Sequence, residues 1–202
     1  AFEAGIPTEA RMPQGCTGGF RFGNRVWRCW DPKGHGATNA ISAFAVSCDV
    51  YYYQVGLRLG MDRINGVARR LGFGARTEID LEDDRSGLLM DSATYTRMYG
   101  RRGWRWTPGL ILNLSMGQGQ IATPVQLANF VAGMANGKVI YRPRLLREVR
   151  DARGHLVHST QPEVLQRVDL SEEEHDLVIR LLSEVVNGPR GTGGRARVPG
   201  VW

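Results

Sequence analysis

Three cysteines and one histidine are concentrated in the first quarter of the chain, and their chemistry constrains how this part can fold. They are spaced Cys16-x12-Cys29-x5-His35-x12-Cys48. Three thiolates and one imidazole form a known structural set for Zn²⁺, which takes four such ligands in a tetrahedron. The alternative is a disulfide between Cys16 and Cys29 in an exported protein, with Cys48 as a buried thiol. The residues alone leave both interpretations open.

The elements predicted around these residues bring them within reach of one another. The segment 16–29 has the pattern of a β-hairpin with a turn at Gly23-Asn24. The mouth of a hairpin places its two ends side by side, so Cys16 and Cys29 are expected to be neighbours. Two helices are then expected to meet at Cys48. Their predicted boundaries are a cap at Thr38 or Asn39, an end near Ser47, a new start at Asp49 and an end at Gly60.

The rest of the chain mixes helical and strand patterns, which predicts a mixed α/β fold. The expected elements are a helix ending at Gly72, an extended loop over 74–89, a short helix over 91–99, a brief strand within 107–119, a helix from Thr123 to Asn136, two or three short strands within 138–162, a long helix opened by a capping box at Ser171 and Glu174, and a strand beginning at the C-terminal end. The helix from Thr123 is expected to bury Val125, Leu127, Ala128, Phe130, Val131 and Met134.

Length and charge narrow the class of protein. The chain has 202 residues, enough for one domain or part of a larger one, and a formal charge of +6 that comes mainly from arginine. A basic balance suits an anionic partner such as a membrane surface, a cell-wall polymer or a nucleic acid, but no nucleic-acid motif is present. No apolar run reaches membrane-spanning length, and no signal peptide is visible. Both ends have the character of interrupted elements, so we expect an excerpt of a longer protein.

The triplet Ser47-Cys48-Asp49 lies between the two predicted helices. Ser-x-Asp commonly marks helix caps, because both side chains bond to nearby backbone groups. The same two side chains can instead face a substrate. The triplet alone does not decide between these two roles.

Other polar clusters are interpreted as solvated surface. The loop over 74–89 carries four carboxylates that lack the ligand alternation and the glycine of an EF-hand loop. These carboxylates are Asp80, Glu82, Asp83 and Asp84. The remaining histidines, expected to be solvent-exposed, are His155, His158 and His175.

The order of these features resembles the transpeptidase domain of class B penicillin-binding proteins, most closely the elongation type, penicillin-binding protein 2. The resemblance spans nearly the whole chain. It is carried by the segments GGFRFGNRVWRCWDPKGHG, SCDVYYYQVGLRLGMDRI, LGFGARTEIDLEDDRSGLL, LSMGQGQIATPVQLANFVAGMANG and VVNGPRGTGGRARVPGV.

The resemblance implies a role for the Ser-x-Asp triplet. The family uses Ser-x-x-Lys, Ser-x-Asn or Ser-x-Asp, and Lys-Thr/Ser-Gly. Ser47-Cys48-Asp49 is similar to the second motif, which makes Ser47 and Asp49 catalytic candidates. The nucleophilic serine, its lysine and the Lys-Thr-Gly strand are expected outside this sequence, so the excerpt is expected to be inert by itself.

The resemblance also implies a metal. Similar members carry a zinc site beside the active site, with ligands before and after the hairpin, a histidine, and the middle residue of Ser-x-Asp. Cys16, Cys29, His35 and Cys48 fall on these four places, which favours a structural Zn²⁺ over the disulfide.

The implied architecture is part of the transpeptidase domain, a helical subdomain with part of the sheet subdomain. We expect a hairpin and zinc segment over 16–48, a helical region over 49–137, and strands with a long helix over 138–202. The implied activity is peptidoglycan crosslinking by serine acyl transfer. The implied partners are stem peptides, β-lactams and membrane proteins of the elongation complex, with no nucleic acid, at the periplasmic face of the inner membrane.

Two rival functions share some of these features. A serine β-lactamase or β-lactam sensor has the same fold and motif order. A zinc-stabilised structural or interaction module requires no catalysis. The hairpin with its cysteines and the GQG-x-x-x-TP-x-Q block favour the transpeptidase.

Overall fold

The chain forms two compact units, and a computed structural model describes residues 1–200 of it. The strand expected at the C-terminal end, at Val201 and Trp202, lies outside the described residues. Unit 1 comprises residues 1–65, 90–119 and those from Glu172 onward, and unit 2 comprises residues 66–89 and 120–171. The three-part sequential division of the chain stays a prediction.

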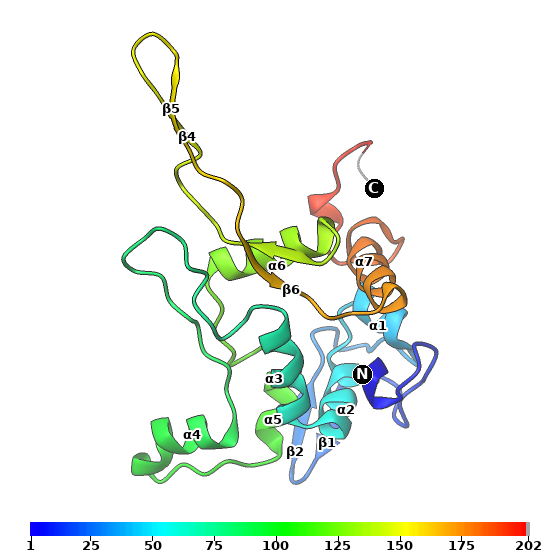
Figure 1. Cartoon of the computed structure of the whole chain (residues 1–202). Coiled ribbons are helices and arrows are strands. Elements are labelled where there is room, and N and C mark those ends of the chain that lie inside the picture. The colour runs from blue at the N-terminus through cyan, green and yellow to red at the C-terminus, as the bar shows by residue number, and fades with distance from the viewer. Residues whose placement is uncertain (201–202) are drawn as a thin grey trace. The chain divides into compact units, whose positions relative to one another are not determined.

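Unit 1 is mainly helical and includes one β-hairpin (Figure 1). Its elements are η1 (Phe2–Ala4), β1 (Gly19–Phe22), β2 (Arg25–Arg28), α1 (Ala40–Ala45), α2 (Asp49–Leu59), α4 (Ser92–Tyr99), η2 (Gly100–Arg102), α5 (Gly109–Leu114), α7 (Glu172–Asn187) and η3 (Gly194–Ala196). Helix α3 (Met61–Arg70) begins in unit 1 and ends in unit 2.

The hairpin β1–β2 has the predicted turn and packs one face on helix α2. Its strands pair antiparallel from Gly19 with Arg28 to Phe22 with Arg25, and Gly23 supplies the positive φ of 61° that the turn requires. Phe20 and Trp27 form a cross-strand pair. Both rings lie against Tyr53 of α2, at 6.3 and 6.2 Å between centroids. These aromatic contacts anchor the hairpin on the helix.

The predicted helix boundaries around the Ser-x-Asp triplet are confirmed. Asn39 caps α1, accepting from the amide of Ser42, whose hydroxyl accepts from the Asn39 amide in return. Helix α2 starts at Asp49 and ends before Gly60, where φ is 73°.

The brief strand predicted within 107–119 is wrong, because this segment forms helix α5. A short apolar run such as Leu-Ile-Leu fits either structure, and tertiary packing decides. Helix α5 lies against α2 at Gly56, where a Cβ would come within 2.4 Å of the Ser115 Cβ. The missing side chain at Gly56 allows the two helices to approach closely.

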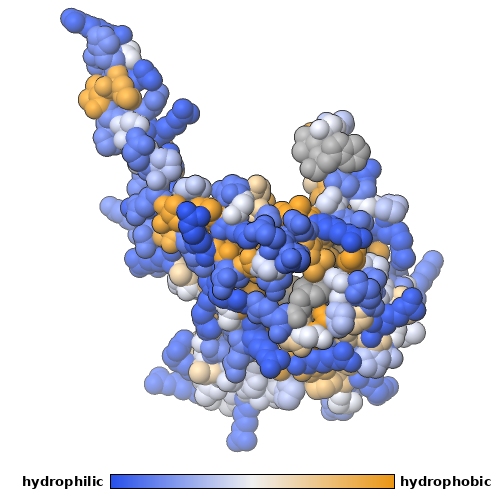
Figure 2. Space-filling model, turned by 45° about the vertical axis from the view of Figure 1, so that its right-hand side comes forward, coloured by the Kyte–Doolittle hydropathy of each residue, from blue (hydrophilic) through white to orange (hydrophobic). Residues whose placement is uncertain are grey.

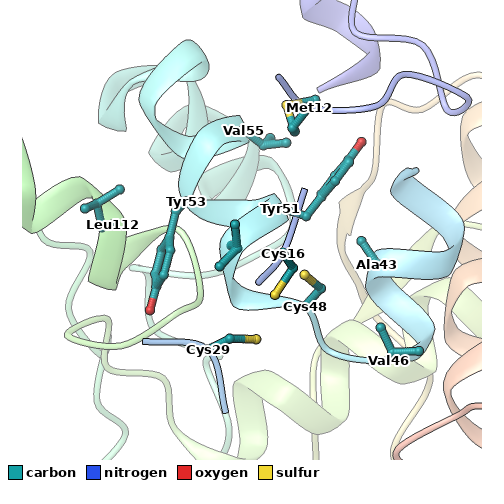
Figure 3. Packing of buried hydrophobic residues seen from close by; sticks show 11 residues of the cluster. Met12, Cys16, Cys29, Ala43, Val46, Cys48, Tyr51, Tyr53, Val55 and Leu112 are labelled. Atoms are coloured by element: carbon teal, nitrogen blue, oxygen red, sulfur yellow. The ribbon is translucent and has the colours of Figure 1, made fainter. Parts of the chain in front are cut away.

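The core of unit 1 gathers around α2 and includes all three cysteines (Figure 3). Its buried members are Met12, Cys16, Cys29, Ala43, Val46, Cys48, Val50, Tyr51, Tyr53, Val55 and Leu112. Each of these side chains is at most 7% exposed.

Helix α7 packs beside α1 through a partly buried apolar face. His175 in its first turns is half-buried rather than exposed as predicted, whereas His155 and His158 are exposed. Among residues 1–200, none of the helices combines the length and the apolar character needed to cross a bilayer.

Unit 2 contains α6 (Pro124–Ala135) and four short strands. The predicted capping box is present, since Thr123 and Gln126 bond to each other's amides. The predicted buried face is partly wrong: Leu127 and Val131 are 50% and 55% exposed and Ala128 is exposed too, while Gly133 and Met134 are buried. A Cβ at Gly133 would come within 2.7 Å of Ile140, so this face of α6 packs directly on β3.

The strands of unit 2 form two separate antiparallel pairs. Strand β3 (Val139–Tyr141) pairs with β6 (Val164–Arg167), and β4 (Glu148–Arg150) pairs with β5 (Leu156–Ser159). All residues of β4 and β5 are exposed. Figure 2 shows a hydrophobic patch on this otherwise hydrophilic hairpin, whose exposed apolar residues include Leu156 and Val157.

Candidate functional site

The chain turns sharply between α1 and α2, and this corner carries the Ser-x-Asp triplet. Ser47 has a left-handed backbone with φ of 53°, which few residues other than glycine adopt. The Ser47 amide donates to the Phe44 carbonyl at 3.1 Å, and the Cys48 amide donates to the Ala43 carbonyl at 2.8 Å. The Ser47 side chain is exposed and Cys48 is 0% exposed. The corner thus presents a hydroxyl to the outside and a thiol to the core.

Asp49 links the corner to the end of the hairpin. Its Oδ2 accepts from the backbone amide of Trp30 at 2.8 Å, and the Trp30 indole Nε1 donates to the carbonyl of Val46 at 3.0 Å. Asp49 is also the first residue of α2, where a carboxylate is favoured by the helix dipole. Among the described residues, Asp49 therefore accepts its hydrogen bond from Trp30 and not from the Ser47 hydroxyl.

The four predicted metal ligands come together from four different segments. Cys16 precedes β1, and its backbone exchanges hydrogen bonds of 2.7 and 2.9 Å with Gly36, next to His35. Cys29 follows β2, and Cys48 is the N-cap residue of α2. The three sulfurs turn toward one another (Figure 3). All four ligand atoms lie within 4.8 Å of one another, so the structure brings together the whole predicted set.

Two glycines allow the segments around the cluster to approach closely. A Cβ at Gly34 would lie 2.2 Å from the Cys16 carbonyl oxygen, and one at Gly18 would lie 2.1 Å from the Pro32 carbonyl oxygen. Both glycines also have positive φ. Only glycine fits there, which gives the Pro/Gly character of this loop a structural reason.

Two of the distances in the cluster match those between the ligands of a tetrahedral metal site. Ligands about 2.3 Å (sulfur) and 2.0–2.1 Å (nitrogen) from Zn²⁺ lie about 3.5–3.8 Å from one another. The His35 Nδ1 atom lies 3.7 Å from Cys16 Sγ and 3.5 Å from Cys29 Sγ. The His35 Nε2 atom is buried without a hydrogen-bond partner among the described residues.

Burial makes the thiols of Cys29 and Cys48 reluctant to ionise by themselves. It raises the pKa of Cys48 to about 12 and raises the pKa of Cys29. All three cysteines are free, with no disulfide among them. A bound cation reverses this preference, because it stabilises thiolates directly.

The other polar candidates form ordinary surface interactions. In the loop 74–89, Asp84 accepts from Thr77 at 3.0 Å and from the Glu78 amide at 2.7 Å. Asp80 accepts from the amide of Leu145 at 3.0 Å. Within residues 1–200, the cysteine and histidine cluster is the group of side chains that could hold a metal.

Sequence reasoning missed two residues beside the corner. Trp30 bridges the hairpin exit and the corner, and its ring lies 5.4 Å from that of His35. Thr192, in the loop after α7, lies with its Oγ1 atom 2.8 Å from the Ser47 Oγ atom. No local pattern marks Thr192, since 145 positions separate it from Ser47.

Comparison with known proteins identifies the family. The family described as the penicillin binding protein transpeptidase domain matches residues 14–201. The chain belongs to this family.

The relatives of this penicillin-binding transpeptidase domain agree with the assignment. The peptidoglycan D,D-transpeptidase MrdA of Salmonella typhimurium is 33% identical over 84% of this chain, which spans about 27% of that relative. The crystal structure of Pseudomonas aeruginosa PBP2 in complex with WCK 5153 superposes with a TM-score of 0.75 at 28% identity. That match covers 95% of this chain and 43% of the other. The fold class expected from the sequence is confirmed.

A further structural relative belongs to a larger assembly. It is described as "Structural coordination of polymerization and crosslinking by a peptidoglycan synthase complex". It superposes with a TM-score of 0.76 at 28% identity, and the match covers 96% of this chain and 31% of the other. The predicted resemblance to penicillin-binding protein 2 is thus confirmed by both sequence and structure.

Proposed function

We propose that the chain is part of a peptidoglycan D,D-transpeptidase of the penicillin-binding protein 2 type, and that Ser47 and Asp49 belong to its active site. The observation that carries the proposal is the corner between α1 and α2, where Ser47 is exposed on a left-handed backbone. Backbone strain of this kind clusters at active sites. Family membership supports the assignment, whereas no comparison favours a β-lactamase, a sensor or a purely structural module.

In the proposed reaction, a nucleophilic serine attacks the D-Ala–D-Ala amide of a stem peptide, the amide C–N bond breaks, the terminal D-Ala leaves as an amine, and an acyl-enzyme remains. A neighbouring amine then accepts the acyl group, and β-lactams bind in place of the donor. The 202 residues contain neither Ser-x-x-Lys nor Lys-Thr-Gly. The nucleophile and its lysine therefore have to come from residues other than these.

Ser47 is the residue of this chain proposed to move a proton. Its hydroxyl both donates and accepts, so it can pass a proton between the lysine and the departing amine. Asp49 holds the corner in place through its bond to the Trp30 amide. An ionised carboxylate accepts hydrogen bonds but cannot donate one, so Asp49 contributes position and charge rather than a donor.

Acylation by a fluorescent penicillin tests the role of Ser47. The test uses a longer protein that contains this sequence together with the Ser-x-x-Lys and Lys-Thr-Gly motifs, and therefore carries all three motifs. We expect Ser47→Ala to slow acylation by roughly a hundredfold, the usual effect of removing a proton-transfer group. The control is Thr107→Val, at an exposed threonine of unit 1. Normal acylation by Ser47→Ala would reduce Ser47 to a helix-boundary residue. The 202-residue chain itself should not be labelled.

We also propose the partners and location that accompany this activity. The substrates are peptidoglycan stem peptides, with β-lactams as inhibitors. Membrane proteins of a cell-elongation complex are the expected partners, supported by the synthase complex among the structural relatives. The domain would then work on the periplasmic side of the inner membrane, where peptidoglycan is crosslinked.

We further propose that Cys16, Cys29, His35 and Cys48 hold one structural Zn²⁺. The support is the approach of all four ligand atoms to within 4.8 Å, with the His35 Nδ1 atom 3.7 and 3.5 Å from the sulfurs of Cys16 and Cys29. Four protein ligands leave no open position for substrate, so the ion would act as a clamp. The clamp would fix Cys48, and with it the backbone on either side, to the end of the hairpin.

Metal analysis of the purified 202-residue chain tests this proposal. We expect about one equivalent of zinc, a melting temperature lowered by a strong chelator, and restoration by added Zn²⁺. His155→Ala, at an exposed histidine, is the matched control for His35→Ala. A mass two hydrogens below that of the fully reduced chain, without metal, would establish the Cys16–Cys29 disulfide instead.

A further inference from the structure

The loop that follows α7 lies against the Ser-x-Asp corner. Thr192 in this loop brings its Oγ1 atom to 2.8 Å from the Ser47 Oγ atom, the usual length of a good hydroxyl–hydroxyl hydrogen bond. Both residues belong to unit 1. The bond joins two exposed side chains from opposite ends of the chain.

Thr192 is fixed by its backbone and not only by its hydroxyl. Its amide donates to the carbonyl of Ala45, the last residue of α1, at 3.1 Å. Its Oγ1 atom also lies 3.4 Å from the same carbonyl oxygen. Thr192 is therefore docked on the end of α1, two residues before Ser47, so its hydroxyl reaches Ser47 from a fixed position.

Because two of its residues are glycines without side chains, this part of the loop packs closely on α7. A Cβ at Gly191 would lie 2.3 Å from the Val185 carbonyl oxygen, and one at Gly193 would lie 3.0 Å from the Val185 side chain. The Gly193 amide donates to the Val185 carbonyl at 2.9 Å. Arg197 closes the helix end by donating to the carbonyls of Val186 and Asn187 at 3.2 and 2.8 Å. Thr192 thus stands between two glycines that let the loop reach α1.

From these contacts we infer that Thr192 is a positioning residue that orients the Ser47 hydroxyl for proton transfer. The inference rests on the function proposed above for Ser47. A serine hydroxyl rotates freely, and only one of its orientations aims both its hydrogen and its lone pairs usefully. The Thr192 hydroxyl can donate to Ser47 or accept from it, and either arrangement restricts this rotation. A hydroxyl held in place before the reaction avoids the cost of ordering it during the reaction.

If the hydrogen bond between Ser47 and Thr192 served only to hold the loop in place, losing it would lower the stability of the fold and leave proton transfer unchanged. Hydrogen bonds between exposed groups add little to folding, because water replaces either partner. Losing the Thr192 hydroxyl should therefore leave stability unchanged and should slow proton transfer at Ser47. This separates the positioning role from a role in holding the loop.

Thr192→Val tests the inference in a protein that carries all three motifs, since valine keeps the shape and removes the hydroxyl. We expect acylation by a fluorescent penicillin to slow by about tenfold, the effect of one lost hydrogen bond. The dissociation constant of the penicillin before acylation and the melting temperature should not change. Thr192→Ser should restore the rate, and the control Thr107→Val should behave as the unmodified protein.

A double-mutant cycle shows whether Thr192 acts through Ser47. Adding Thr192→Val to Ser47→Ala should slow acylation no further, because the hydroxyl to be oriented is already absent. An equal slowing in both backgrounds, a normal rate for Thr192→Val, or a failure of Thr192→Ser to restore it would overturn the inference. A normal rate for Ser47→Ala alone would instead refute the proposed function of Ser47.

Discussion

Hairpins β1–β2 and β4–β5 have strands of nearly the same length but opposite exposure to solvent. Hairpin β1–β2 of unit 1 packs its aromatic face on α2, and the cysteines at its two ends are 3% and 6% exposed. Hairpin β4–β5 of unit 2 is exposed along both strands. A two-stranded hairpin alone is at best marginally stable in water. The stability of β1–β2 therefore comes from what lies beneath it and between its ends.

The corner that carries Ser47 lies in the restrained region, so its side chains are held in fixed positions. The corner with Ser47 is attached to α2, to the hairpin through Trp30 and Asp49, and to the loop after α7 through Thr192. The proposed metal adds a fourth attachment through Cys48. Among residues 1–200 no comparable set of bonds is described for β4–β5, whose ion pairs, such as that of Glu148 with Arg150, are exposed. Exposed pairs of this kind contribute little.

The largest difference between the hairpins is expected when the metal ligands are lost. Cys48→Ala should destabilise the zinc-loaded chain by more than about 4 kcal/mol, the range typical of losing a metal. Amide hydrogen exchange should accelerate at β1–β2 and stay unchanged at β4–β5. In chains stripped of metal, the same substitution should have a much smaller effect. A large effect that persists without metal would show that Cys48 acts by packing alone.

The stability of the metal-free protein and that of the zinc-loaded protein should change with pH in opposite directions. The raised Cys48 pKa means that the metal-free folded protein keeps a proton that the unfolded chain releases. Its stability is therefore complete below pH 9.0 and falls as the pH rises toward about 12. The zinc-loaded protein should instead lose stability in acid, because protons compete with zinc for the ligands. Urea unfolding across the pH range measures both trends.

Packing alone should also separate the two regions. Val50 beneath the corner is 0% exposed, and Val157 on β5 is 66% exposed. Val50→Ala should cost about 2–3 kcal/mol, whereas Val157→Ala should change stability by less than about 0.5 kcal/mol. Urea unfolding of the two variants provides the measurement. Similar costs would mean that β4–β5 is buried by a partner in solution.

A smaller effect is expected in the loop that carries Thr192. Gly191→Ala places a Cβ against the Val185 carbonyl and should destabilise unit 1 by about 1–3 kcal/mol. Gly194→Ala is the matched control, because the nearest atom to a Cβ there is 4.0 Å away. Thermal unfolding should rank the two variants in this order. Equal stability of the two would contradict the close packing of this loop.

The smallest expected effect concerns the strained backbone at Ser47. Ser47→Gly should be more stable than Ser47→Ala by about 1 kcal/mol, since glycine adopts the φ of 53° without strain. Both variants lack the hydroxyl and should acylate equally slowly in a protein with all three motifs. Equal melting temperatures would indicate that the corner is not strained.

Local signals explain what the sequence could predict. The hairpin turn at Gly23-Asn24, the cap at Asn39 and the capping box of α6 involve residues within four positions of one another, and all three are confirmed. The grouping of Cys16, Cys29, His35 and Cys48 was also predictable, because a hairpin mouth and a helix junction bring chain segments together in known ways.

Long-range packing explains what the sequence could not predict. The segment 109–114 became a helix, against the expected strand, because of its fit on Gly56. The buried face of α6 depends on where β3 lies, which leaves Leu127 and Val131 exposed despite their apolar character. Thr192 reaches Ser47 only through the packing of α7 on α1 and the glycines beside it.

The central claim is that one metal ion joins the hairpin to the corner that presents Ser47. X-ray absorption at the zinc edge on the purified 202-residue chain tests it most directly. We expect three sulfur neighbours at about 2.3 Å and one nitrogen at about 2.0–2.1 Å, with one sulfur lost in Cys48→Ala. A coordination shell of oxygen and nitrogen alone, or an unchanged sulfur count in Cys48→Ala, would contradict the claim.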